Sequence, residues 1–232
     1  MTPLRRKAVK RIQVEKKPKR RISGEERRAQ ILRVAGDLFI NEGIDHTSMR
    51  RIASGAGVTA TLLYRHFLSK EDLLKAIGEA FFIQLAGYLD AATCEACDPV
   101  ERLRRLMRAY VTCGIDNPRA YHLTFMTAVP RLRRGQEMKA FREKLRRGVS
   151  IPADELLMGM ACFARLEAAV ADVVKAKRAR VKDVATLSEV VWSAGHGLVA
   201  LVITHDDFGF SPTPLLIEAS IDVMLNGLVQ KK

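Results

Sequence analysis

The residues best suited to binding chemistry cluster in a short stretch of the N-terminal third. They share hydroxyl, imidazole or basic side chains on one predicted short helix and its flanks: Thr59, Thr61, Tyr64, Arg65, His66 and Lys70. Such groups hydrogen-bond to phosphate oxygens, and the basic ones also neutralise the phosphate charge. The pattern therefore favours binding of a polyanion at this helix.

No catalytic constellation stands out in the sequence. There is no glycine-rich phosphate loop, no GxSxG, no HExxH and no convincing Ser/His/Asp set. Cys94 and Cys97 form a single CxxC, and residues 205–207 (His-Asp-Asp) are adjacent, whereas a zinc site needs about four ligands. We therefore predict no enzymatic activity, no cofactor and no metal. Two further cysteines, Cys113 and Cys162, do not complete a disulfide framework, so a reducing cytoplasm is the expected location.

The 232-residue chain carries a net charge of +13 that is unevenly distributed. Residues 1–70 hold 17 Lys and Arg against 6 Asp and Glu, whereas residues 71–232 hold 22 against 20. A basic third joined to a nearly neutral remainder indicates a polyanion partner at one end. Residues 1–24 are expected to form a disordered basic arm, either solvated or following DNA. An apolar signal segment is missing and no uncharged apolar run reaches 18 residues, so we expect no secretory signal peptide, no membrane span and no membrane partner. An acidic membrane surface is an open alternative for the basic arm.

Hydrophobic periodicity predicts helices along the whole ordered chain. The N-terminal helices are expected over about 25–42, 48–56 and 59–67, followed by a long helix that begins at the capping box Ser69-x-x-Asp72. Further helices are expected over about 99–116, 118–129, 152–177, 183–204 and 214–229, with a weaker stripe at 130–147. We therefore predict an all-α fold.

The two short predicted helices meet at a glycine turn. Gly57 stands where a left-handed turn residue is needed. Apolar side chains on both sides can lock the angle between the helices: Ile52, Ala53, Val58, Leu63 and Phe67. This is the arrangement of a helix-turn-helix, whose second helix lies in the major groove of DNA.

Residues 47–74 closely resemble the TetR family of transcriptional regulators. The matching motifs are Ile52-Ala53, Ala56-Gly57-Val58-Thr59, Leu63-Tyr64-Arg65-His66-Phe67 and Ser69-Lys70-Glu71-Asp72-Leu73. The preceding predicted helix also matches the family. The resemblance implies an N-terminal three-helix DNA-binding domain over residues 25–70 and a helical ligand-binding and dimerisation domain over residues 71–232.

The predicted DNA contacts come partly from chemistry and partly from the resemblance. Thr47 and Ser48 stand at a predicted helix N-terminus, where hydroxyl and free N–H groups can take a phosphate. The resemblance implies phosphate contacts for Tyr64 and His66, with Lys70 similarly placed. The full set of expected DNA-binding residues is Thr47, Ser48, Arg50, Thr59, Ala60, Thr61, Tyr64, Arg65, His66 and Lys70.

One position departs from the family pattern. The family often has a small polar residue where this chain has Leu62, and glycine or another small residue where it has Thr61. The residue that reads bases is therefore left open, and Leu62 could instead meet a thymine methyl group.

The C-terminal part carries weaker motifs. Trp192-x-x-x-His196-Gly197 resembles the Trp-His-Gly signature of one branch of the family, and the segment from Asn117 to Met126 resembles the usual start of its sixth helix. An apolar ligand pocket is expected among the middle helices, with plain core packing as the alternative for each residue. The candidates are Met107, Tyr110, Phe125, Met126, Met160, Phe163, Trp192 and His196.

The last two predicted helices are apolar on more than one side. A second copy of the chain is expected to cover them, and a deep core within one chain is the alternative. The resemblance implies a homodimeric repressor that a small apolar or aromatic effector releases from a palindromic double-stranded DNA operator. An architectural or weakly specific DNA binder, driven by the basic arm, is the alternative function.

Overall fold

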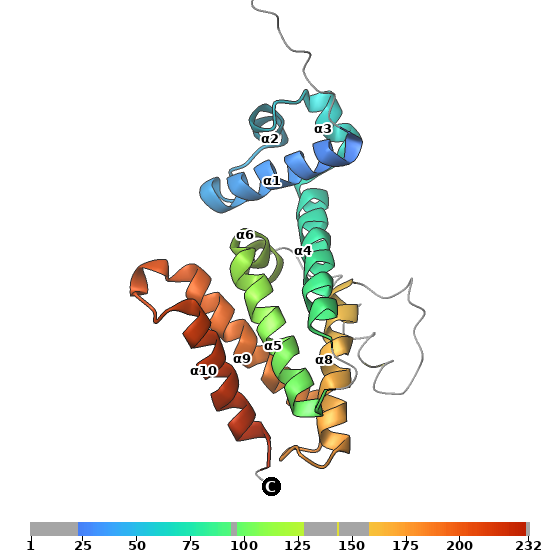
Figure 1. Ribbon diagram of the computed structural model, residues 1–232. Helices are drawn as coiled ribbons and strands as arrows, with labels where there is room; N and C mark the ends of the chain where they lie inside the picture. Colours follow the sequence, from blue (N-terminus) through green and yellow to red (C-terminus); the bar gives the residue numbers. More distant parts are fainter. Residues whose placement is uncertain (1–22, 94–96, 128–142, 144–157, 231–232) are drawn as a thin grey trace, which may run out of the picture.

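The computed structural model describes residues 23–93, 97–127, 143 and 158–230, and every regular element in these ranges is a helix. Figure 1 shows a small group of helices, α1 to α3, set at one end of a longer bundle. The long helix α4 (Lys70–Ala92) runs from this group down the side of the bundle. The predicted all-α fold is confirmed.

The N-terminal group consists of α1 (Gly24–Glu42), α2 (Met49–Gly55) and α3 (Ala60–His66). The short helices begin as predicted, because the hydroxyls of Ser48 and Thr59 accept hydrogen bonds from backbone amides of the first turn. The predicted helix-turn-helix is therefore present. The basic arm lies outside the described residues, except for its last two positions.

The remaining elements form the bundle. They are α5 (Pro99–Asp116), α6 (Pro118–Tyr121), the π-helix η1 (His122–Met126), α8 (Met158–Lys175), α9 (Val184–Thr204), the 3-10 turn η2 (Asp206–Phe208) and α10 (Thr213–Leu228). The helix predicted over 118–129 is wrong in two respects. Its second half is wound as a π-helix, and it ends at Met126 because Thr127 is extended. The helix predicted at 130–147 falls almost entirely outside the described residues.

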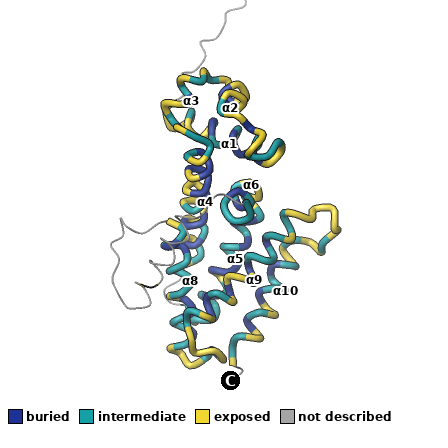
Figure 2. The backbone as a smooth tube through the Cα atoms, turned by 180° about the vertical axis from the view of Figure 1, so that it is seen from behind, coloured by how far each residue is buried: buried dark blue, intermediate teal, exposed yellow. Residues whose placement is uncertain are grey.

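Two hydrophobic cores hold the molecule together. The larger one joins α4, α5, α8, α9 and α10, and the smaller one lies among α1 to α4. Leu123 of η1 is 5% exposed and belongs to the smaller core, although its helix continues directly from the bundle. Arg119 of α6 also pairs with Asp37 of α1 at 2.6 Å. Two segments, α4 and α6–η1, therefore connect the N-terminal group to the bundle, and Figure 2 shows buried positions along much of α4.

Two observations differ from the sequence-based expectations. By length and composition alone, α9 is long and apolar enough to cross a membrane. Its most apolar 18-residue window has a mean hydropathy of 1.4, and 28% of that window is buried inside the protein. The helix packs against α5, α8 and α10, which explains part of its apolar character. Cys97 is disulfide-bonded, whereas Cys113 and Cys162 are free and buried.

Candidate functional site

The exposed face of α3 carries the residues expected to meet DNA. Leu63 and Phe67 are 0% and 3% exposed and anchor the helix in the smaller core. Thr61, Tyr64 and Arg65 point the other way and are exposed, with Tyr64 at 46%. Burial of the first two thus presents the other three to solvent on one surface.

The other predicted DNA-binding residues surround this face. Ser48 and Arg50 are exposed at the start of α2, and Thr59 is exposed at the start of α3. Ala60 and His66 are half-buried at the two ends of α3. Hydroxyl groups therefore lie at the N-terminal ends of both short helices, and basic groups lie at the start of α2 and in the last turn of α3.

Thr47 differs from the expectation for it. It is only 1% exposed, and its hydroxyl donates to the carbonyl of Gly43 at 2.8 Å. That hydroxyl therefore stabilises the turn between α1 and α2 and does not face outward. Lys70 is also engaged within the protein, because its ammonium donates to the carbonyl of Ile44 at 2.7 Å. An ammonium has three donors, so this contact still leaves Lys70 able to reach a phosphate.

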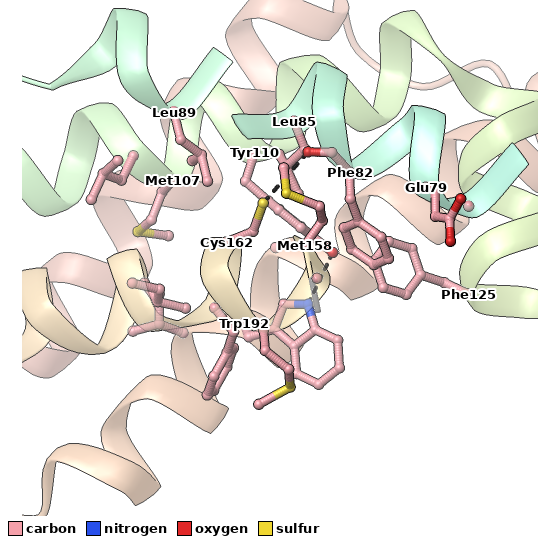
Figure 3. A pocket seen from close by; sticks show the side chains of 18 of the residues that line it. Glu79, Phe82, Leu85, Leu89, Met107, Tyr110, Phe125, Met158, Cys162 and Trp192 are labelled. Carbon is pink, nitrogen blue, oxygen red and sulfur yellow. Dashed lines mark hydrogen bonds between the residues drawn. The ribbon is translucent and has the colours of Figure 1, made fainter. Parts of the chain in front are cut away.

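A second candidate site is a cavity of about 780 Å³ in the bundle. Side chains from α4, α5, α8 and α9 line it, together with Phe125 of η1. Figure 3 shows Leu89, Leu85, Phe82 and Glu79 following one another along its α4 wall, with Trp192 on the opposite side. The volume lies within the roughly 300–1,000 Å³ typical of small-molecule sites.

Most of the predicted ligand-binding residues lie on this cavity. The six that line it are Met107, Tyr110, Phe125, Met160, Phe163 and Trp192. Met126 and His196 are not among its lining residues. His196 instead hydrogen-bonds to Tyr121, behind the wall.

The α4 wall was not predicted from the sequence. Phe82 and Leu85 of that wall lie in a helix whose apolar stripe reads as ordinary core. The adjacent pair Phe81–Phe82 was the available signal, because neighbouring helix positions point about 100° apart and two large rings side by side can face different surroundings. Phe81 is 1% exposed in the larger core, while Phe82 is half-buried on the cavity.

A chain of hydrogen bonds runs from the cavity wall into the protein. Trp192 Nε1 lies 3.0 Å from the Tyr110 hydroxyl, which lies 2.9 Å from the Tyr121 hydroxyl. The Tyr121 hydroxyl lies 2.6 Å from Nδ1 of His196. Burial raises the pKa of Tyr110 to about 12 and also raises the pKa of Tyr121, and burial lowers the pKa of His196. All of these groups are therefore uncharged at neutral pH.

Three of the four charged residues that line the cavity gather at one end, and the fourth, Glu189, lies on α9. Glu71, Lys75 and Glu79 lie on the first turns of α4, nearest the helix-turn-helix, and all three residues are exposed. Lys75 and Glu79 are 3.8 Å apart, a loose pair one helical turn apart. The interior of the cavity is thus apolar and aromatic, and this end is polar.

Comparison with known proteins adds independent information. The family of bacterial regulatory proteins called tetR matches residues 31–77, which include α2, α3 and most of α1. The HTH-type transcriptional repressor KstR2 of Mycobacterium tuberculosis is 37% identical over 92 residues, covering 38% of this chain and 46% of KstR2. The HTH-type transcriptional activator FasR of Mycolicibacterium smegmatis is 31% identical over 105 residues, covering 45% of this chain and 48% of FasR. These matches span less than half the length of either relative.

Solved structures extend the likeness to the bundle. The TetR family transcriptional regulator PfmR of Thermus thermophilus has a TM-score of 0.64 and 25% identity, covering 88% of this chain and 98% of that protein. The similarity therefore includes the helices that surround the cavity. The helix-turn-helix of this chain therefore matches the tetR family of bacterial regulatory proteins, and its all-helical architecture is similar to that of a solved TetR family regulator.

Proposed function

We propose that this chain is a homodimeric DNA-binding transcriptional regulator whose affinity for its operator falls when a small apolar molecule occupies the cavity. The observation that supports it most directly is the exposed face of α3. Thr61, Tyr64 and Arg65 form it on a domain matched by the tetR family. Repression is the proposed direction, although the relatives include both a repressor and an activator.

The construction of α4 supports coupling between the two sites. Leu73 and Ile77 of this helix are buried in the core of the DNA-binding domain. One to three turns further on, Phe82, Leu85 and Leu89 line the cavity. A ligand that shifts the second group would move the first, because both belong to one rigid element.

The last two helices supply the proposed dimer surface. On α9, Val190 and Leu201 are 47% and 52% exposed, and on α10, Leu215 and Val223 are 62% and 76% exposed. The two helices pack against each other, so these side chains can form one apolar surface. An apolar surface of this kind favours a partner, and a second copy would place two α3 helices on one duplex.

The proposal is tested by a gel shift with the DNA upstream of the gene that encodes the chain. We expect a sequence-specific complex that weakens with salt and is lost or strongly weakened in Tyr64→Ala. Phe208→Ala is the matched control, because Phe208 is a 72% exposed aromatic residue outside the DNA-binding domain. Equal affinity for any duplex would contradict the proposal and favour the architectural alternative.

A further inference from the structure

The two ends of the hydrogen-bond chain behind the cavity wall fix its direction. An indole N–H only donates, so Trp192 donates to the Tyr110 oxygen. If Tyr121 also donated to Tyr110, the Tyr110 O–H would point into an apolar space. A buried donor left without an acceptor costs about 1–3 kcal/mol. The chain is satisfied when Tyr110 donates to Tyr121.

At the other end of the hydrogen-bond chain, His196 supplies the acceptor. Tyr121 is fully buried, and its oxygen accepts the hydrogen bond from the Tyr110 O–H. Its own O–H therefore donates to Nδ1 of His196. An uncharged imidazole accepts at one ring nitrogen, and burial of His196 favours that uncharged form. Every donor from Trp192 to Tyr121 then has an acceptor.

This direction determines what the chain offers to a ligand. Trp192 and Tyr110 both line the cavity, and their donors are already used within the chain. A phenol oxygen has two lone pairs, of which Tyr110 uses one to accept from Trp192. The hydrogen-bond chain therefore presents an acceptor, the Tyr110 oxygen, to the cavity.

The shape of the cavity restricts the body of the ligand. Its lining extends from Glu71 to Leu89 along α4, and 18 residues of helix rise span about 27 Å. A volume of about 780 Å³ spread along that length describes an elongated space. Phe82, Phe163 and Leu166 represent its apolar interior.

From these observations we infer that the effector is an elongated, mostly apolar molecule carrying a hydroxyl group that donates to the oxygen of Tyr110. The inference rests on the proposed function, because it names the class of molecule that the regulatory cavity takes. A long-chain alcohol satisfies both requirements. The corresponding ether has the same apolar body but offers no donor.

The test uses 1-decanol and its isomer methyl nonyl ether as a matched pair of probes. Trp192 is the single tryptophan of the chain, so its fluorescence reports on occupancy directly. We expect the alcohol to bind about 3- to 10-fold more tightly than the ether, the ratio that one net hydrogen bond provides. Similar binding of the two probes, or no binding of either, would overturn the inference.

Two variants separate the hydrogen bond from a change in packing. In Tyr110→Phe the ratio should approach one because the alcohol loses affinity. In Tyr121→Phe the Tyr110 O–H loses its acceptor and becomes a donor to the cavity, so the ratio should approach one because the ether gains affinity. If both variants weaken the binding of the alcohol and of the ether equally, the hydrogen-bond chain has no role in selectivity and the inference fails. The gel shift is run without the alcohol or the ether, so it tests the DNA-binding function separately.

Discussion

The Tyr121 hydroxyl lies 2.6 Å from Nδ1 of His196, and this contact joins α6 to α9. The two rings also stack, with centroids 5.5 Å apart and planes inclined by 27°. Tyr121 is fully buried, so its hydroxyl depends on partners inside the protein. The pair therefore links the cavity wall at Tyr110 to the segment α6–η1, whose Leu123 lies in the smaller core with the helix-turn-helix.

Protonation of His196 should destabilise the folded protein. Burial lowers its pKa below the ordinary 6.5, so over the interval below 6.5 the unfolded chain binds a proton that the folded chain does not. The free energy of unfolding should therefore fall as the pH drops from 6.5 to the lowered pKa. His196→Asn keeps an acceptor for Tyr121 and cannot titrate, so its stability should fall less over that interval. Urea unfolding of both proteins from pH 8 to pH 5 measures this, and parallel curves would contradict it.

Adding one methyl group at Gly114 should destabilise the bundle. A Cβ atom there would lie 2.7 Å from a methyl group of Val199 and 3.0 Å from the ring of Tyr121. Overpacking of this kind costs about 1–3 kcal/mol, which thermal or urea unfolding of Gly114→Ala can detect. Gly87→Ala in α4 is the control, since its Cβ would meet nothing within 4 Å. It should be neutral or stabilising by up to about 1 kcal/mol, and an equal loss in both variants would rule out the packing explanation.

Removal of Arg65 should reduce the salt dependence of DNA binding. Its guanidinium is exposed on α3, where a phosphate contact would release about one counterion. In Arg65→Ala the slope of log affinity against log salt should become shallower by about one, with similar weakening for all duplexes. Fluorescence anisotropy at several salt concentrations measures the slope. Arg105→Ala, a charge removed from α5, should leave it unchanged, and a slope unaltered by Arg65→Ala would exclude the contact.

Charge placed on the α9–α10 surface should separate the dimer. Val223 is 76% exposed, and Val223→Asp would put a carboxylate in the proposed apolar interface, where a desolvated charge is costly. Sedimentation velocity should show a dimer for the unmodified protein and a monomer for this variant. Ile83→Asp is the control, because Ile83 is 61% exposed on α4, away from this surface, and should leave the protein dimeric. A dimer that survives Val223→Asp would place the interface elsewhere.

The sequence by itself determined the helices and the helix-turn-helix motif. These features depend on neighbours a few residues apart: Ser48 and Thr59 cap their own helices, and Gly57 adopts a φ of +62° in the turn between them. Spacing also assigned the buried side of α3, because Leu63 and Phe67 are one turn apart. Local rules are sufficient wherever the interacting groups are close along the chain.

Only the tertiary structure decided how distant residues meet. Trp192 and Tyr110 are 82 positions apart, and Tyr121 and His196 are 75 apart, so no local pattern pairs them. The contribution of α4 to the cavity and the burial of the Thr47 hydroxyl also follow from how the elements pack. An amphipathic helix has about two apolar positions per turn, and its sequence does not state which of them face a neighbour and which line an open space.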